Sequence, residues 1–299
     1  MEYYQPHTIV YHGGRFLPAD QARGSLFSQT LHYGLGVFGG LRAYDTPDGP
    51  RIFRARAHFE RLLASARIMG IPCDYSADRL MQIAYQLLDE NQLEAAYLRP
   101  LLYLDDNMSL QLKETSASTL LMAAWPWDKL LGDRPLHVHV SSIVRPSPKA
   151  FPTEAKTCGL YVNSILASTH ARRQGYDEAL LLDPDGNVAE GASANVFYER
   201  DGVLYTPPRG HILPGITRRA VIDLAREKEI EVVERHFKTD ELYAADAAFF
   251  TGTAVEIAPI ASVNRISYRK PYEETLTYEL EQDFKIYVRS FPDPSYTII

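Results

Sequence analysis

The sequence predicts a two-domain protein of mixed α and β structure. Its 299 residues are more than one average domain needs and are enough for two, each with a core of its own. Two amphipathic helical patterns precede two apolar strands in the first half, and a polar segment containing Gly and Pro follows them at residues 128–135. We therefore expect a small α/β domain at residues 1–127, a linker at 128–135 and a large domain at 136–299.

Two helices and two strands are expected in the first domain. Residues 56–70 place Phe59, Leu62, Leu63 and Ala66 on one helical stripe. Residues 76–90 repeat this pattern behind Ser76, a residue type that caps helices, with a stripe formed by Leu80, Ile83, Ala84, Leu87 and Leu88. The segments "AAYLRPLLYL" (95–104) and "STLLMAAWPW" (118–127) are typical of strands.

The second domain alternates strands with helices. Residues 136–145 alternate apolar and polar positions, and residues 178–191 and 195–208 are typical of hairpins that turn at Asp185-Gly186 and Asp201-Gly202. Helices are expected at about 161–174, ended by Gly175, and at 215–228, opened by Pro214-Gly215.

Composition excludes two broad classes of protein. A net charge of -7 argues against nucleic-acid binding, which needs a basic surface. No apolar run approaches the 18 or so residues that cross a bilayer, so we expect no membrane partner. Two cysteines and an N-terminus without a signal-peptide pattern favour a reducing, cytoplasmic location.

Residues 32–44, "HYGLGVFGGLRAY", contain a G-x-G-x-x-G formed by Gly34, Gly36 and Gly39. In a dinucleotide-binding unit, a strand leads into these glycines and a helix starts at them. Here the residues that follow, 39–49, alternate like a strand and end in a turn. We therefore reject a nicotinamide enzyme.

The same stretch resembles the N-terminal motif of the fold-type IV, PLP-dependent branched-chain aminotransferases, close to H-Y-G-x-x-x-F-E-G-x-R-x-Y. The family glutamate is replaced here by Gly39. Further segments resemble the family in its own order, namely "HFERLLASA", "YLRPL", "AAWPW", "AKTCGLYVNSILASTHARRQGYDEALLLD", "AEGASANVF", "LPGITR" and "FFTGTAVEIAP". The resemblance covers nearly the whole chain and implies the two-domain fold of type IV PLP enzymes.

Lys156 is the catalytic candidate. It is flanked by small residues, Ala155, Thr157 and Gly159, which can line a cramped site. Desolvation there lowers the pKa of an amine, as a Schiff-base lysine requires. The resemblance implies that Lys156 holds pyridoxal 5'-phosphate as an internal aldimine and later moves a proton between the substrate α-carbon and the cofactor C4′.

Other cofactor-binding residues also follow from the resemblance. Glu190 is expected to pair with the pyridine nitrogen and keep it protonated, and Tyr161 to hydrogen-bond the ring oxygen. The phosphate is expected at a helix N-terminus that offers the amides of Ile216 and Thr217, together with the Thr253 hydroxyl and the Arg61 guanidinium.

Substrate recognition is expected around Tyr97-Leu98-Arg99, which matches the Y-x-R pattern of branched-chain members, whereas D-amino-acid aminotransferases resemble R-x-H at this place. The resemblance implies that Arg99 reaches the distal carboxylate of 2-oxoglutarate or glutamate. Tyr97 and the amides of Thr253 and Ala254 are expected to hold the α-carboxylate. The expected apolar pocket comprises Tyr33, Phe38, Trp127, Tyr161 and Leu130, the last standing where the family usually has a tyrosine.

We therefore predict transamination between a branched-chain or other hydrophobic L-amino acid and a 2-oxo acid. The departures at Gly39 and Leu130 favour a broadened donor range that includes (R)-primary amines or D-amino acids. An aminodeoxychorismate lyase is disfavoured by the Tyr97-x-Arg99 pair, and a non-catalytic ligand-binding protein by the retention of Lys156 with Glu190 and Arg61.

No metal site is predicted. "DPDGN" resembles the start of a calcium loop, yet the twelfth position is Ala194 instead of the required glutamate. His137 and His139 alternate on one strand without a third ligand nearby. The resemblance implies a homodimer or larger homo-oligomer, in which loops around Tyr33 and residues 108–110 help to close the neighbour's site.

Overall fold

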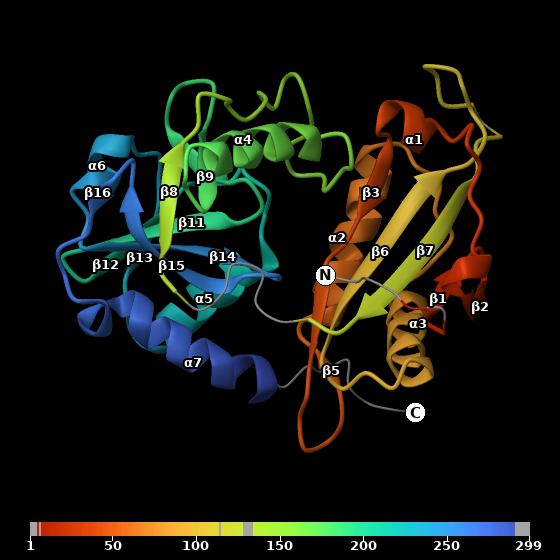
Figure 1. The fold of residues 1–299 in the computed structure, drawn as a ribbon, viewed down its shortest axis with the longest axis horizontal. Coiled ribbons are helices and arrows are strands. Elements are labelled where there is room, and N and C mark those ends of the chain that lie inside the picture. Colours follow the sequence, from red (N-terminus) through yellow and green to blue (C-terminus); the bar gives the residue numbers. More distant parts are fainter. Residues whose placement is uncertain (1–4, 6, 114, 128–133, 291–299) are drawn as a thin grey trace. The chain divides into compact units, whose positions relative to one another are not determined.

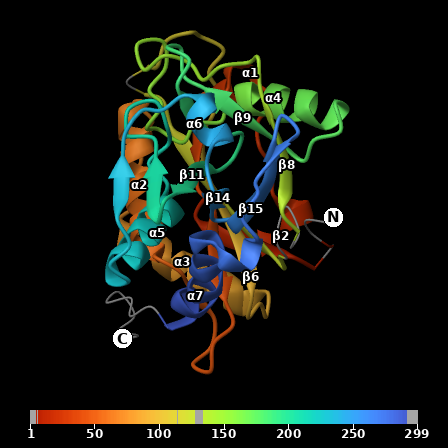
Figure 2. The ribbon, with the colours of Figure 1, turned by 90° about the vertical axis from the view of Figure 1, so that its left-hand side faces the viewer.

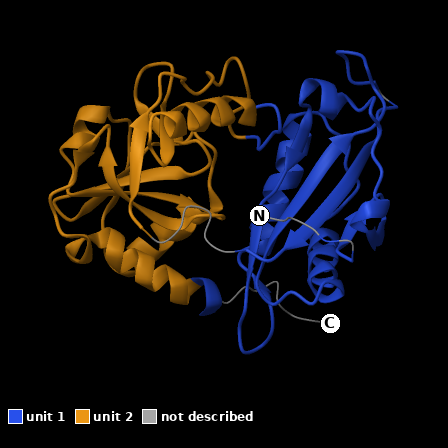
Figure 3. Cartoon of the chain, viewed as in Figure 1, with its two compact units in different colours: residues 1–127, 155–160, 288–299 blue, residues 128–154, 161–287 orange. Residues whose placement is uncertain are grey.

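The computed structural model describes residue 5 and residues 7–113, 115–127 and 134–290. The chain forms two compact units, coloured separately in Figure 3. Unit 1 comprises residues 1–127, 155–160 and 288–299, and unit 2 comprises residues 128–154 and 161–287. This division differs from the expected one at residues 155–160 and 288–299, which the sequence pattern assigns to the large domain. Most of the expected linker, residues 128–133, lies outside the described residues.

The described part of unit 1 contains a seven-stranded antiparallel sheet in the order β2-β1-β7-β6-β4-β5, with β3 also paired to β6. Its strands are β1 (Ile9–His12), β2 (Arg15–Pro18), β3 (Gly36–Phe38), β4 (Leu41–Tyr44), β5 (Arg51–Ile52), β6 (Ala96–Leu104) and β7 (Ser118–Trp125). The predicted strands at 95–104 and 118–127 are therefore confirmed. They pair with each other along their full length, from Tyr97 opposite Trp125 to Leu104 opposite Ser118.

Helices α2 (Ala55–Ile68) and α3 (Ala77–Glu90) cover this sheet (Figure 1). Helix α2 packs against α3 and β3, while α3 packs against β1 and β7. The predicted apolar stripes are buried apart from Leu63, which is partly buried, and the Ser76 side chain caps α3 by accepting a hydrogen bond from the Arg79 amide at 3.1 Å. Both predicted helices are confirmed. Two shorter helices complete the unit, η1 (Ala19–Gln21) and α1 (Gln29–Tyr33).

The order of helix and strands around the glycines of the G-x-G-x-x-G is the reverse of that in a dinucleotide site. Gly34 ends α1 in the left-handed conformation, at φ 73°, and Gly36 begins β3. Strand β4 starts directly after Gly39 and Gly40. A helix therefore precedes these glycines and strands follow them, the reverse of the strand-to-helix turn of a dinucleotide site.

Unit 2 contains a sheet of nine described strands in the order β10-β9-β8-β15-β14-β11-β12-β13, with β16 paired to β15. Its strands are β8 (Leu136–Val140), β9 (Glu178–Leu182), β10 (Val188–Gly191), β11 (Asn195–Arg200), β12 (Val203–Thr206), β13 (Val232–Glu234), β14 (Ala247–Gly252), β15 (Glu256–Val263) and β16 (Ile266–Ser267). Strand β10 also pairs with β11 through Glu190 opposite Asn195. This pair closes the six strands from β10 through β9, β8, β15 and β14 to β11 into a ring.

Helices lie on two sides of the unit 2 sheet. They are α4 (Tyr161–Arg173), α5 (Ile216–Glu227), α6 (Thr239–Tyr243), η2 (Tyr272–Glu274) and α7 (Leu276–Ser290). Within this unit, α4 lies above the sheet and α7 below it in both Figure 1 and Figure 2. Helix α4 packs against β9, and α5 packs against β13 and β14. The predicted helices at 161–174 and 215–228 are confirmed.

Both predicted hairpins of unit 2 are confirmed. Asp201 and Gly202 join β11 to β12 with φ angles of 51° and 77°, the left-handed pair that a tight hairpin turn requires. In the β9–β10 turn, the Asp183 carboxylate accepts hydrogen bonds from the amides of Asp185 at 2.9 Å and Asn187 at 2.8 Å. "DPDGN" is therefore a hairpin turn whose first aspartate holds the turn closed.

Every helix within the described ranges is too short or too polar to cross a lipid bilayer.

Candidate active site

Lys156 lies in a short segment of unit 1 that is joined to β3 by an isolated bridge between Val37 and Thr157. Its carbonyl accepts a hydrogen bond from the Phe38 amide at 3.1 Å, and the Cys158 amide donates to the Gly36 carbonyl at 2.9 Å. The Lys156 amide donates to the Ser65 hydroxyl of α2 at 3.1 Å. These bonds explain why residues 155–160 belong to unit 1, although the sequence on both sides of them belongs to unit 2.

Glycine is required where this segment meets the end of α1. A Cβ atom on Gly34 would lie 2.9 Å from the Gly159 Cα, and Gly34 already has a φ of 73°. The Gly159 amide donates to the Gly34 carbonyl at 3.0 Å. The first glycine of the motif therefore serves the backbone approach that seats the lysine segment.

The Lys156 side chain lies beside Phe38, which is also next to Arg99. The Nζ atom is 4.8 Å from the centroid of the Phe38 ring, and the Arg99 guanidinium carbon is 4.9 Å from the same centroid. Arg99 also donates to the Tyr97 hydroxyl at 3.4 Å. One aromatic ring thus contacts two cations, so this part of unit 1 suits a ligand that has both an anionic group and an apolar group.

Tryptophans extend the aromatic surface from Tyr97. The Tyr97 ring centroid is 4.9 Å from that of Trp127 and 5.3 Å from that of Trp125. A Cβ atom on Gly40 would lie 2.0 Å from the Tyr97 hydroxyl oxygen. Gly40 is therefore what allows the Tyr97 phenol to occupy its position. Leu130, the other predicted pocket residue nearby in sequence, lies outside the described residues.

Gly39 packs closely against the strand that carries Arg99. A Cβ atom at position 39 would lie 2.7 Å from Cγ of Pro100. Proline cannot rotate away because its ring is bonded to the backbone. The departure from the family glutamate therefore coincides with a tight contact to the Pro100 ring in this chain.

The buried His58 of α2 is influenced by the charges of Lys156 and two arginines. His58 is 2% exposed, and its Nδ1 has no hydrogen-bond partner among the described residues. Burial lowers the pKa of His58 well below its usual value, and the charges of Arg61, Lys156 and Arg54 lower it further. The imidazole is therefore neutral at pH 7, and the cations around it form a site that favours an anion.

Glu190 is the centre of the site residues in unit 2. Its Oε1 lies 2.9 Å from Nη2 of Arg145, and the side chains of the two residues are only 7% and 5% exposed. Its Oε2 accepts hydrogen bonds from the Asn195 side-chain amide at 3.0 Å and from the Leu213 backbone amide at 3.1 Å. The carboxyl group is thus buried, ion-paired and held in one orientation.

Asn195 joins Glu190 to the start of α5. Its side-chain amide donates also to the Leu213 carbonyl at 3.0 Å. A Cβ atom on Gly215, the N-cap of α5, would lie 1.9 Å from the Asn195 Oδ1 atom. Glycine at the cap is therefore needed for this contact.

The remaining predicted residues of unit 2 lie at turns and helix starts. Ile216 and Thr217 are the first residues of α5, where backbone amides are not used by the helix and can bind an anion. Thr253 and Ala254 lie in the turn between β14 and β15, in which the Val255 amide donates to the Gly252 carbonyl at 3.3 Å. Tyr161 is the first residue of α4.

Tyr33 is exposed, whereas Phe38, Tyr97 and Trp127 are partly or fully buried. It ends α1, its side chain is 48% exposed, and its hydroxyl donates to the Met108 carbonyl at 3.3 Å.

Four residues of these sites were missed by the sequence reasoning: Ser65, His58, Arg145 and Asn195. Asn195 had a usable signal, since it follows the Glu190 hairpin strand closely and pairs with Glu190 across it. His58 and Ser65 lie on the same α2 face as Arg61, at helical spacing. Arg145 had no local signal, because its partnership with Glu190 depends on how the sheet closes.

The two histidines considered as metal ligands have hydrogen-bond partners on β15 and in the turn after it. His137 Nδ1 is 2.7 Å from the Ser262 hydroxyl, and His139 Nδ1 is 3.1 Å from the Asn264 side-chain oxygen. These contacts give both side chains a structural role between β8 and its neighbours.

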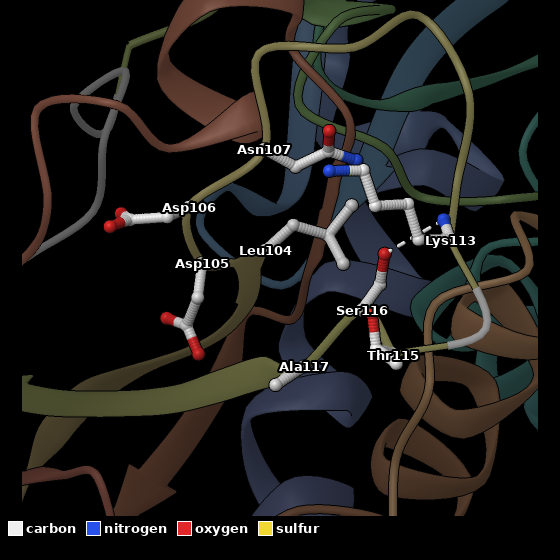
Figure 4. Close-up of a pocket in the computed structure, with 8 residues that line it drawn as sticks. All are labelled: Leu104, Asp105, Asp106, Asn107, Lys113, Thr115, Ser116 and Ala117. Carbon is white, nitrogen blue, oxygen red and sulfur yellow. Dashed lines mark hydrogen bonds between the residues drawn. The ribbon is translucent and has the colours of Figure 1, made fainter.

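Unit 1 also contains a polar cavity of about 450 Å³ at the end of β6 (Figure 4). In Figure 4, the carboxylates of Asp105 and Asp106 lie on one side and Lys113 on the other. The cavity begins at Leu104, five residues along β6 from Arg99, a separation of roughly 17 Å in an extended strand. The cavity is therefore distinct from the site around Lys156, Phe38 and Arg99.

The sequence matches the family model described as Amino-transferase class IV over residues 36–263. This span contains Lys156, Glu190 and the turn that carries Thr253. The chain belongs to the class IV amino-transferase family and is an enzyme.

Its similar relatives are branched-chain aminotransferases. The branched-chain-amino-acid aminotransferase of Pseudomonas aeruginosa is 42% identical over 261 residues, which cover 86% of this chain and 85% of that protein. The structure of the Escherichia coli branched-chain amino acid aminotransferase has a TM-score of 0.92 at 37% identity and covers 97% of this chain and 98% of its own. The branched-chain amino acid aminotransferase of Thermobaculum terrenum in its PLP-bound holo form has a TM-score of 0.89 at 33% identity, with 95% of each chain covered. The expected α+β fold of type IV and the resemblance to this family are confirmed.

Proposed function

We propose that this enzyme transfers the amino group of branched-chain and other hydrophobic L-amino acids to a 2-oxo acid such as 2-oxoglutarate, with pyridoxal 5'-phosphate (PLP) as cofactor. The observation that carries the proposal is the placement of Lys156. A lysine amine lies 4.8 Å from the Phe38 ring, and Arg99 contacts the same ring at 4.9 Å. An amine, an apolar surface and a guanidinium are the groups that this reaction needs on the substrate side.

The residues of unit 1 fit one part of PLP. Lys156 has the amine for covalent attachment to the cofactor aldehyde. The cations around the buried His58, with its Nδ1 lacking a partner among the described residues, suit a phosphate, and we assign Arg61 to it. With PLP bound, Lys156 Nζ would serve as the general base for the proton on the substrate α-carbon and then as the general acid.

The residues of unit 2 fit the rest of the cofactor. We assign Glu190 to the pyridine nitrogen, where Arg145 and Asn195 hold its carboxyl group in place. Bound PLP supplies an electron sink for the carbanion, and a protonated ring nitrogen strengthens that sink. We assign Tyr161 to the ring oxygen, and the phosphate to the amides of Ile216 and Thr217 with the Thr253 hydroxyl.

The substrate contacts follow the same division. We assign Tyr97 and the amides of Thr253 and Ala254 to the α-carboxylate, and Arg99 to the distal carboxylate of glutamate or 2-oxoglutarate. We assign Tyr33, Phe38, Trp127, Tyr161 and Leu130 to the apolar side chain of a leucine-like donor.

A broader donor range, with (R)-primary amines or D-amino acids, is the second candidate. It is favoured by Gly39, which has no carboxylate to hydrogen-bond the arginines of this region and packs directly against Pro100. A site with fewer polar groups holds a polar substrate less selectively and tolerates a less polar amine better.

We further propose a homodimer or larger homo-oligomer that works in the cytoplasm. Met108 and Leu110 are 48% and 83% exposed in unit 1, and Val162, Ile165 and Leu166 form an exposed apolar stripe along α4 of unit 2. Apolar stripes of this kind are typical of protein interfaces. Cys73 and Cys158 are both free thiols, as a reducing compartment favours. Sedimentation analysis that gives a monomer at micromolar concentration would contradict the assembly.

The direct test of the chemistry is covalent capture of PLP. The purified protein is incubated with PLP and reduced with borohydride, and the labelled peptide is identified by mass spectrometry. We expect the label on Lys156, its loss in Lys156→Ala, and its retention in Lys149→Ala, which removes an exposed lysine. Label on another lysine, or no label, contradicts the proposal.

Donor scope is tested by a substrate panel with 2-oxoglutarate and pyruvate as acceptors. Leucine, D-alanine and (R)-1-phenylethylamine serve as donors. We expect the highest kcat/KM for leucine with 2-oxoglutarate. Measurable turnover of the other two donors supports the broader range, and confinement to leucine, isoleucine and valine excludes it.

A further inference from the structure

The hydroxyl of Ser65 connects helix α2 to the segment that carries Lys156. It donates a hydrogen bond to the Arg61 carbonyl at 2.8 Å and accepts one from the Lys156 amide at 3.1 Å. Ser65 is only 1% exposed. Water therefore has little access to this hydroxyl, and its two bonds fix the direction of its proton and of its lone pair.

One of these two bonds is ordinary and the other is not. A serine within a helix commonly donates to the carbonyl four residues earlier, as Ser65 does to Arg61. That bond needs no partner outside the helix. The bond from Lys156 joins positions 91 residues apart and is formed by the backbone of the proposed catalytic lysine. A purely helical role for Ser65 does not explain it.

The carbonyl side of Lys156 is bonded to the backbone beside it. Its carbonyl accepts from the Phe38 amide at 3.1 Å, and the next bond of this ladder runs from Cys158 to Gly36. Substitutions other than proline leave the groups that form these bonds in place. The amide of Lys156, in contrast, depends on one hydroxyl, so that its position can be released by a single change on α2.

The Ser65 hydroxyl is bonded to the backbone of both Lys156 and Arg61. Residues 58, 61 and 65 lie on one face of α2, and Ser65 bonds the Arg61 carbonyl directly. The charges of Arg61 and Lys156 both lower the pKa of the buried His58. A shift of the Lys156 segment away from Ser65 therefore moves the amine relative to the guanidinium that we assign to the phosphate.

We propose that Ser65 is a positioning residue for Lys156, whose hydroxyl keeps the lysine backbone in register with Arg61 on α2. This inference rests on the proposed role of Lys156 in attaching PLP. In Ser65→Ala, the side chain of Lys156 remains present, but its backbone amide loses the hydrogen bond to α2. A reacting group displaced by as little as about 1 Å can lose as much as about 100-fold in rate, so we expect kcat to fall by about 10- to 100-fold with KM little changed.

Two control variants separate positioning from stability. Ser76→Ala removes a bond of the same kind and length in the same unit, from the Arg79 amide to a serine hydroxyl at 3.1 Å. Ser28→Ala removes a buried hydroxyl, which donates to the Leu104 carbonyl at 2.6 Å. Ser65→Thr keeps the hydroxyl, and threonine in a helix can make the same bond to the preceding turn.

The first measurement is hydrogen exchange of the peptide spanning residues 155–160 in protein without PLP. We expect faster exchange in Ser65→Ala, unchanged exchange in Ser76→Ala and Ser28→Ala, and recovery in Ser65→Thr. Exchange of this peptide in Ser65→Ala equal to that of the wild type overturns the proposal, whatever the activity.

The second measurement is the rate of covalent PLP attachment, followed by borohydride capture at Lys156, together with kcat and KM for leucine. We expect Ser65→Ala to slow attachment and lower kcat, and the two control variants to lower only the melting temperature. Equal slowing in the controls shows a general loss of stability and overturns the proposal. A wild-type protein that captures no PLP refutes the proposed function, whereas the exchange experiment on that protein still decides whether Ser65 holds Lys156.

Discussion

Replacing Arg145 with methionine is expected to destabilise unit 2 strongly. The Arg145–Glu190 pair is 2.9 Å apart, and both side chains are at least nine-tenths buried. Methionine keeps much of the volume of arginine but leaves the Glu190 carboxylate without a countercharge. Removing one partner of a buried ion pair costs about 3–5 kcal/mol, because the remaining charge stays buried.

The loss is measured by calorimetry and by chemical unfolding of protein without PLP. A loss of about 3–5 kcal/mol corresponds to a fall of about 6–20 °C in melting temperature for a unit of this size. The variant Arg145→Met/Glu190→Gln carries no charge at the pair, and its remaining amide can still bond Asn195. We therefore expect it to lose clearly less than the sum of the two single variants.

Two results would refute this reasoning. One is an Arg145→Met protein whose free energy of unfolding lies within about 0.5 kcal/mol of the wild type, the range of ordinary surface changes. The other is a double variant whose loss equals the sum of the two single losses. Either result would mean that Arg145 and Glu190 do not depend on each other.

Three further substitutions, all in unit 1, test other features of the structure. Gly40→Ala places a methyl group where its carbon would lie 2.0 Å from the Tyr97 hydroxyl oxygen, so the phenol must move. We expect KM for leucine to rise about 10-fold, which corresponds to the loss of one hydrogen bond to the substrate. An unchanged KM would show that Tyr97 does not bind the carboxylate. Gly39→Glu restores the family residue but brings Cβ to 2.7 Å from Pro100 Cγ, so unfolding by urea should show a loss of about 1–3 kcal/mol, and an equal midpoint would contradict the tight contact. His58 has a folded-state pKa well below the ordinary histidine value of 6.5, so the unfolded chain binds more protons below pH 6.5. Stability should then fall as pH drops below that value, by about 1.4 kcal/mol per pH unit down to the folded-state pKa, and unfolding curves at stepped pH should show a flatter profile for His58→Gln. Equal slopes for the two proteins would disprove the role of His58.

The sequence predicted those elements whose signals are local. Helices α2 and α3 follow from amphipathic stripes, and the Asp-Gly hairpins follow from residues that adopt positive φ at low cost. Helix α7, Leu276–Ser290, was not predicted, although it is longer than either of the two. The ring closure of the unit 2 sheet had no local signal, because it depends on the pairing of β10 with β11.

Candidate site residues were predicted mainly where a family motif names them. Lys156 and Glu190 came from the resemblance, and their roles stay predictions. Their partners Ser65 and Arg145 could not be found in this way, because a serine on a helix and an arginine in a loop have no distinctive pattern. What makes them important is a contact distant in sequence, to the Lys156 amide in one case and to the Glu190 carboxylate in the other.

The short lysine segment also determines when unit 1 can be finished during synthesis. The chain leaves unit 1 after residue 127, returns for residues 155–160 and leaves again, so that neither unit is one uninterrupted stretch. A nascent chain that has emerged only to residue 127 already contains β1–β7. It lacks residues 155–160, which form backbone hydrogen bonds with β3. Translation must therefore proceed through the first part of unit 2 before unit 1 can close, and a truncated product ending at residue 127 exposes an unpaired sheet edge that is prone to aggregation.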